Sequence, residues 1–165
     1  PELENTLKSN KLGNLDVFIA GVGTGGTIMG FYHYFSELLH NKNDFKAFPI
    51  LPDKNEDEGH RIEGIGDSFV PRILDLEALE PVLRVKDSDA INIARQVNKL
   101  GLSVGISSGA NLFGAIIKAS ELPASGNVAT VLPDGNKKYL TTDLCSEGKE
   151  PLSEEIKILD YELIS

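Results

Sequence analysis

The chain of 165 residues contains one cysteine, one methionine and no tryptophan. A single cysteine, Cys145, excludes an internal disulfide, and such sparing use is typical of a reducing compartment. We therefore expect a cytoplasmic location. Long apolar runs are missing too, and none approaches the roughly 18 residues of a membrane-spanning helix. The first residues are polar and show no secretory signal pattern.

Basic residues are few relative to acidic ones. Lys and Arg number 16 against 25 Asp and Glu, so the formal net charge is -9 at pH 7. A surface this acidic repels phosphate backbones and anionic lipids, so we expect neither nucleic acid nor membrane as a partner. The three histidines and the cysteine show no metal-ligand spacing, and we predict no metal site.

Hydrophobic residues make up 41% of the chain, which is enough for a packed core. Four short apolar runs predict strands, at residues 15–20, 45–51, 83–86 and 127–133. Three stretches with helical periodicity predict helices, at residues 24–40, 87–100 and 109–122. Pro49 inside the second run is typical of an edge strand. The alternation predicts an α/β fold, an open and mostly parallel twisted sheet with helices on both faces, over residues 1–150, followed by a tail at 151–165.

Capping residues accompany two of the predicted helices. Residues 87–89 (Asp-Ser-Asp) offer N-cap chemistry for the second helix, and Gly101 ends it. Ser107 or Ser108 offers the same chemistry for the third helix. The residue pattern at 154–165 fits either a short strand or a helix.

The segment GVGTGGTIMG, residues 21–30, lies between the first predicted strand and the first predicted helix. Glycines let a backbone turn sharply and approach a ligand closely. The N–H groups at a helix start attract anions, and Thr24 and Thr27 add hydroxyl donors. The sequence therefore predicts a phosphate-binding loop, with a tight turn that binds nothing as the alternative.

Two kinds of ligand fit this loop. Gly21, Gly23 and Gly26 match the dinucleotide fingerprint G-x-G-x-x-G. The acid that this fingerprint expects about 20 residues further on would be Asp44 or Asp53, and the domain would then be an NAD(P)-binding oxidoreductase. The dense run of glycine and threonine fits instead a single terminal phosphate, wrapped by amides and hydroxyls together.

Four segments together resemble cysteine synthase and cystathionine β-synthase, fold-type-II enzymes that use pyridoxal 5′-phosphate. The first is the glycine loop, GTGGTIMG. The others follow in the family's order: HRIEGIGDSFVPRILD at 60–75, GISSGAN at 105–111 and VLPDGNKKYLTT at 131–142. The resemblance covers most of the chain and begins partway through the family's sequence. It implies the large carboxy-terminal domain of that fold, with the cofactor bound to it.

The resemblance also implies roles for individual residues. For the cofactor it implies contacts from Gly23, Thr24, Gly25, Gly26, Thr27 and Gly64. For the substrate pocket it implies Gly66, Asp67, Ser68 and Ser107. Asp134 stands near the place where the family carries a serine that contacts the pyridine nitrogen. Asp134 would make that contact, or it is a turn residue before Gly135.

The family's catalytic lysine has no counterpart in this sequence. In such enzymes the Schiff-base lysine belongs to the amino-terminal half, so we expect no catalytic residue in this chain and no activity from it alone. The resemblance implies β-replacement or β-elimination in cysteine metabolism, on a small amino acid with a thiol or sulfide. It also implies a homodimer once the lysine-bearing half is present. A noncatalytic module that binds a phosphorylated metabolite is the remaining alternative.

Overall fold

The computed structural model describes residues 1–38, 45–53, 59–66, 70–146, 153 and 155–162. Its strands are β1 (Val17–Gly21), β2 (Lys46–Pro52), β3 (Leu83–Val85) and β4 (Val128–Thr130). They form one sheet in the order β3-β2-β1-β4, and every neighbouring pair is parallel. The predicted open parallel sheet is confirmed.

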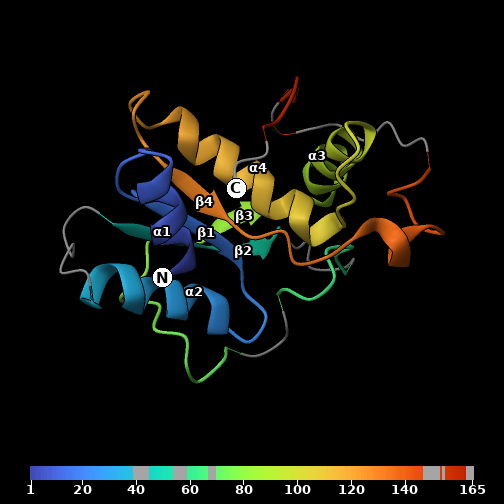
Figure 1. Cartoon of the computed structure of the whole chain (residues 1–165). Helices are drawn as coiled ribbons and strands as arrows, with labels where there is room; N and C mark the ends of the chain where they lie inside the picture. Colours follow the sequence, from blue (N-terminus) through green and yellow to red (C-terminus); the bar gives the residue numbers. More distant parts are fainter. Residues whose placement is uncertain (39–44, 54–58, 67–69, 147–152, 154, 163–165) are drawn as a thin grey trace.

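Helices cover both faces of this sheet (Figure 1). The described helical segments are α1 (Glu2–Ser9), α2 (Gly26–Tyr32), a π-helix (His33–Leu38), α3 (Asp87–Lys99), α4 (Ile106–Ser120) and a 3-10 helix (Asn136–Tyr139). α3 and α4 pack on one face, whereas α1 and α2 pack on the other. The helix predicted at 24–40 is present over residues 26–38, as α2 and the π-helix that continues it, and residues 39–40 lie outside the described part of the chain. Among the described residues, none of the helices has the length and apolar character that crossing a bilayer requires.

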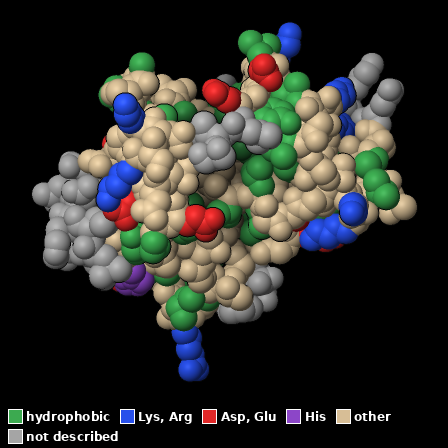
Figure 2. All heavy atoms as spheres, viewed as in Figure 1, with side chains coloured by type: hydrophobic (Ala, Val, Ile, Leu, Met, Phe, Trp, Pro, Cys, Tyr) green, Lys and Arg blue, Asp and Glu red, His purple; other side chains and the backbone are tan. Residues whose placement is uncertain are grey.

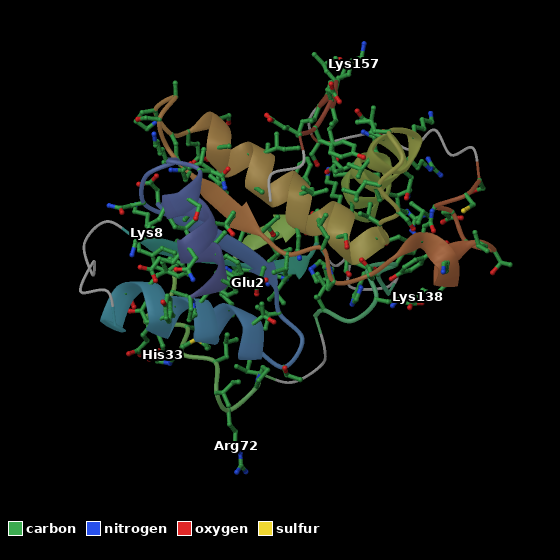
Figure 3. All side chains as sticks on the ribbon, in the orientation of Figure 1. Glu2, Lys8, His33, Arg72, Lys138 and Lys157 are labelled. Carbon is green, nitrogen blue, oxygen red and sulfur yellow. The ribbon has the colours of Figure 1, made fainter. Side chains whose placement is uncertain are left out.

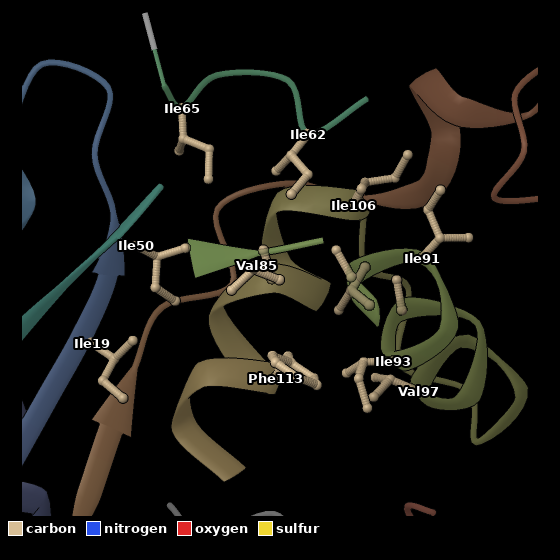
Figure 4. Packing of buried hydrophobic residues seen from close by; sticks show 14 of the residues in the cluster. Ile19, Ile50, Ile62, Ile65, Val85, Ile91, Ile93, Val97, Ile106 and Phe113 are labelled. Atoms are coloured by element: carbon tan, nitrogen blue, oxygen red, sulfur yellow. The ribbon is translucent and has the colours of Figure 1, made fainter. Parts of the chain in front are cut away.

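The strand β1 divides its side chains between two apolar cores. Val17 and Ile19 point into the core beneath α3 and α4, which Figure 4 shows from close by. Phe18 and Ala20 point into the core beneath α1 and α2. Successive side chains of a strand alternate between faces, so a strand covered on both sides must be apolar throughout. This is why the run 15–20 was recognisable as a buried strand.

The expectation that Pro49 marks an edge strand is wrong, because β2 lies between β1 and β3. The even-numbered residues of β2 bond to β1: the Lys46 N–H donates to the Asp16 carbonyl at 2.8 Å, and the Ile50 carbonyl accepts from the Val22 N–H at 3.0 Å. Pro49 therefore turns its nitrogen toward β3. The pairing of β2 with β3 begins only at Ile50, so the missing N–H costs the ladder no hydrogen bond.

The start of α3 also differs from the prediction. Its N-cap is Lys86, whereas Asp87 and Asp89 lie in the first turn. Their carboxylates accept hydrogen bonds from other segments, Asp87 from the Arg61 N–H at 2.7 Å and Asp89 from the Ser153 N–H at 2.8 Å. Negative charge at this helix end still interacts favourably with the helix dipole.

The end of α3 is as predicted, because Gly101 follows it with a φ of 98°. The helix α4, however, begins at Ile106, earlier than predicted, with Gly105 as N-cap. Ser107 and Ser108 therefore lie inside its first turn and are not its caps. The group that caps this turn comes from a distant loop, as described below.

The described residues of the tail lie along α3. The Gln96 side chain donates from Nε2 to the Ile156 carbonyl at 2.8 Å and accepts at Oε1 from the Ile158 N–H at 2.7 Å. Ile156 and Ile158 pack against the core on this side. Residues 155–162 form neither a strand nor a helix, and the domain boundary at residue 150 stays a prediction.

Candidate functional site

The glycine loop follows β1, the strand at which the order of strands in the sheet reverses. The chain passes from β1 to β2 on one side of β1, whereas β4 joins β1 on the other side. The carboxyl ends of β1 and β4 therefore border the switch point at which open α/β sheets bind their ligands. The loop begins at Gly21, the last residue of β1, and ends at Gly26, the first residue of α2.

The start of α2 presents backbone donors. Gly25 is the N-cap with a φ of 83°, a left-handed conformation that favours glycine. Among the described residues no group accepts a hydrogen bond from the N–H groups of Gly26 and Thr27, and such groups at a helix start are donors for an anion. Thr24 and Thr27 are exposed beside them. These groups fit a phosphate.

A second glycine-containing segment supports this loop. The Gly66 N–H donates to the Val22 carbonyl at 2.9 Å. A Cβ on Gly23 would lie 2.6 Å from the Gly64 carbonyl oxygen, which is backbone and cannot move aside easily. The structure thus brings Gly23 and Gly64 together, and glycine at position 23 allows that approach. The cofactor contacts of these residues stay predictions.

The residues predicted for a substrate pocket are mostly buried or outside the described part of the chain. Gly66 is buried, and a Cβ there would lie 2.5 Å from Pro52 Cδ. Ser107 is buried too, and its N–H faces a carboxylate of the loop after β4. Asp67 and Ser68 lie outside the described residues. The pocket role of all four stays a prediction.

Asp134 receives hydrogen bonds at both carboxylate oxygens. Its Oδ1 accepts from the Ser108 N–H at 2.9 Å and from the Ser108 Oγ at 2.5 Å. Its Oδ2 accepts from the Tyr139 hydroxyl at 2.7 Å and from the Ser107 N–H at 3.3 Å. Asp134 therefore caps the first turn of α4 from outside the helix. The cap expected from Ser107 or Ser108 is made by this distant residue.

The electrostatics of Asp134 agree with a capping role. Burial acts to raise the pKa of its carboxyl group, but hydrogen bonds from Ser108, Tyr139 and Ser107 outweigh burial and hold the pKa below the ordinary value. Burial, and then the hydrogen bond to Asp134 and its charge, raises the pKa of the Tyr139 phenol. These contacts favour the structural alternative for Asp134, and its contact with a pyridine nitrogen stays a prediction.

Sequence reasoning missed Asn111 as an individual residue of the site. It lies on α4 with 2% of its surface exposed. Its side chain hydrogen-bonds Gly21 at the end of β1 and Val131 just after β4. A polar side chain amid the apolar residues of a buried helix start was the available signal, because such groups are nearly always hydrogen-bonded to something specific.

A cavity of about 700 Å³ lies beside the loop, between α1 and α2. Its walls include the aromatic rings of Phe18, Phe31 and Phe35, and it reaches the loop at Gly26 and Thr27. The rings of Phe18 and Phe31 stack with centroids 3.7 Å apart. This wall offers apolar surface and not the donors that a phosphate requires.

The described cations form no single large patch on the face shown in Figure 2. The Lys and Arg side chains lie there in several separate groups, mostly toward the edges of the view. Arg72, Lys138 and Lys157 project from separate parts of the fold in Figure 3. The groups that the described glycine loop offers to an anion are the backbone N–H groups at the start of α2 and the hydroxyls of Thr24 and Thr27. In the described part of the chain, no three or more His, Cys, Asp or Glu side chains are placed to hold a metal ion.

The loop geometry favours one of the two predicted ligands. In the dinucleotide fingerprint the third glycine permits close packing of the helix on the strand. Among the described residues, a Cβ on Gly26 would meet Thr24 Oγ1 at 3.7 Å and Ile73 Cδ1 at 4.0 Å, which are ordinary contacts. Of the two candidate acids, Asp53 follows β2 and is exposed, and Asp44 lies outside the described residues. The arrangement favours a single phosphate.

The fold and the loop together define a doubly wound α/β domain with an anion-binding loop at its switch point. Residues 1–134 match the family model described as pyridoxal-phosphate dependent enzyme. The chain is 44% identical over 133 residues to cysteine synthase B of Campylobacter jejuni, a match that covers 79% of this chain and 44% of that protein. It is 37% identical over 137 residues to cysteine synthase of Staphylococcus aureus, covering 80% and 44%.

Solved structures agree with these matches. The hydrogen sulfide-producing enzyme from Fusobacterium nucleatum superposes with a TM-score of 0.81 at 44% identity, covering 91% of this chain and 46% of that one. The O-acetylserine dependent cystathionine β-synthase from Helicobacter pylori gives 0.72 at 30% identity, covering 86% and 47%. This chain therefore belongs to the pyridoxal-phosphate dependent enzyme family, and the predicted resemblance is confirmed. It spans about half the length of the relatives it matches.

Proposed function

We propose that this chain is the carboxy-terminal part of a pyridoxal phosphate-dependent enzyme of cysteine metabolism. The observation that carries the proposal is a glycine loop with open backbone donors, at the switch point of a chain that belongs to this family. The enzyme would perform β-replacement or β-elimination on a small amino acid, with a thiol or sulfide taken up or released. Relatives named cysteine synthase and hydrogen sulfide-producing enzyme support this reaction class.

In this proposal the loop Gly23–Thr27 holds the cofactor's phosphate. The N–H groups at the start of α2 and the hydroxyls of Thr24 and Thr27 would donate to the phosphate oxygens. Gly64, packed against Gly23, would keep the loop in place. The bound cofactor supplies an electron sink for carbanion chemistry, and the residues of this chain bind and orient it.

The reacting amine would come from the remainder of the enzyme. No lysine of this chain lies in a motif that resembles the family's Schiff-base lysine. We therefore propose a lysine-bearing amino-terminal half as the partner of this domain, and a cytoplasmic homodimer as the complete enzyme. The coverage of about half of each relative supports the first point, and the single cysteine supports the location.

The test uses the complete natural polypeptide that contains this chain, purified with pyridoxal phosphate. We expect the yellow absorption band of the bound cofactor, and turnover of O-acetylserine with sulfide, of serine with a thiol, or of cysteine. Saturable binding of NAD or NADP by a protein that takes up no pyridoxal phosphate would overturn the proposal in favour of an oxidoreductase. Binding of a phosphorylated metabolite without turnover of any of these substrates would indicate a noncatalytic module.

A further inference from the structure

The ladder of backbone hydrogen bonds between β1 and β4 ends before it reaches Gly21, the last residue of β1. In this ladder the Val17 N–H donates to the Asn127 carbonyl at 3.1 Å. Because a parallel ladder repeats at every second residue, the same pattern continued would join the Gly21 N–H to the Val131 carbonyl. The pairing of the two strands ends before that rung.

The side-chain amide of Asn111 takes the place of the missing rung. Its Oδ1 accepts from the Gly21 N–H at 2.8 Å, and its Nδ2 donates to the Val131 carbonyl at 2.9 Å. The amide is thus inserted between the donor and the acceptor that would otherwise bond to each other. Only this orientation of the amide satisfies both backbone groups. The residue is 2% exposed, so the insertion belongs to the interior of the fold.

This insertion separates the two strands where the glycine loop begins. The chain passes from Gly21 into the loop. From Val131 it passes to Asp134, whose side chain caps the start of α4. A Cβ on Gly21 would lie 3.3 Å from Asn111 Oδ1, so the amide sits directly against the backbone from which the loop departs. A shift of Asn111 would therefore change the direction in which the loop leaves β1.

We propose that Asn111 is a positioning residue for the phosphate-binding loop. Its amide keeps the crevice between β1 and β4 open and fixes the first residue of the loop, a role that rests on the proposed function because the ligand concerned is pyridoxal phosphate. Asn111 acts through Gly21 and not by touching the phosphate. Without the amide, Gly21 and Val131 bond directly and the loop moves away from its binding position.

The experiment compares two asparagine variants of the complete natural polypeptide. Asn111→Ala removes the inserted amide. Asn98→Ala is the matched control, since Asn98 also accepts from and donates to one pair of backbone groups, those of Val104, at 2.9 and 3.0 Å, on the α3–α4 connection. We expect both variants to unfold at lower urea concentration. Only Asn111→Ala should weaken pyridoxal phosphate binding, by about tenfold or more, the factor that corresponds to one well-made hydrogen bond.

A crystal structure of the Asn111→Ala variant provides a readout that needs no cofactor. We expect the Gly21 N–H to bond directly to the Val131 carbonyl. An unchanged gap between them, or equal losses of cofactor affinity in the two variants, would overturn the positioning role. A wild-type protein that binds no pyridoxal phosphate would overturn the proposed function alone. The crystal structure of the variant would still show whether the Asn111 amide holds Gly21 and Val131 apart.

Asn111→Ser serves if Asn111→Ala does not fold, because its hydroxyl leaves space for a water that bridges the two backbone groups. We expect from it a smaller loss of cofactor affinity than one complete hydrogen bond would produce. If both Asn111 variants fail to fold while Asn98→Ala folds, Asn111 is a general requirement of the fold and the specific positioning role is wrong.

Discussion

At the scale of single residues, the proposed site depends most directly on Gly23. A methyl group there would lie 2.6 Å from the Gly64 carbonyl oxygen, whereas one on Gly30 of α2 would meet no atom of the described residues within 4 Å. The loop must shift to make room for the methyl group, and that shift should break at least one of its hydrogen bonds to the phosphate. We therefore expect Gly23→Ala to weaken pyridoxal phosphate binding by about tenfold or more.

Gly30→Ala is the matched control for this prediction. It places the same methyl group on an open helix position and should raise the free energy of unfolding by about 0.5–1 kcal/mol. Cofactor titration and urea unfolding of both variants make the comparison. Equal cofactor affinities in the two variants would contradict the role given to Gly23.

Asp134 leads to a prediction about pH. Its pKa is lower in the folded state than the ordinary 3.8, so the ionised carboxylate stabilises the fold. That contribution is complete above the ordinary pKa and is lost as the pH falls toward and through the folded value. We expect Asp134→Asn to reduce the free energy of unfolding at neutral pH by about 1–2 kcal/mol, because a charged cap of α4 is lost. The difference from wild type should shrink below pH 3.8.

Urea unfolding over a series of pH values measures this difference. Glu121→Gln is a suitable control, since the Glu121 side chain is 54% exposed in its ion pair with Lys118, and ion pairs open to solvent contribute little. A stability difference between Asp134→Asn and wild type that does not change with pH would show that the charge of Asp134 has no part in capping α4.

At the scale of elements, the contact between α3 and α4 depends on Gly109. A Cβ there would overlap the Ala90 carbonyl oxygen and lie 2.9 Å from Ala94 Cβ. We expect Gly109→Ala to lower the free energy of unfolding by about 3 kcal/mol, because two packed helices must separate. Ser120→Ala, at the exposed end of α4, should change it little. Denaturant unfolding measures both, and similar stabilities would show that the helices can adjust without cost.

The same elements show which boundaries sequence patterns could locate. β1 is apolar on both faces because it is covered on both sides, so composition alone located the strand, although the predicted run 15–20 begins two residues before Val17 and ends one residue before Gly21. The start of α4 was predicted too late, since its cap comes from Asp134, 26 residues away from Ser108. A cap supplied from a distant loop leaves no signal next to the helix.

At the scale of the whole molecule, an acidic chain presents a site for an anion. The formal net charge is -9, and on the face in Figure 2 the described basic side chains form no continuous patch. The candidate phosphate site uses backbone N–H groups at a helix start, whose dipoles do not depend on net charge. Overall charge therefore argues against polyanionic partners without arguing against a small phosphorylated cofactor.

Residue patterns along the chain were sufficient for the α/β class, the parallel strands, the glycine loop and the family, because apolar runs and turn glycines are local signals. The interior place of Pro49, the cap from Asp134 and the insertion of Asn111 required the folded chain. Each depends on contacts between distant segments, and Asn111 lies 90 residues from Gly21 in sequence. Hydrogen bonds of that kind have no periodicity along the chain, so only tertiary packing reveals them.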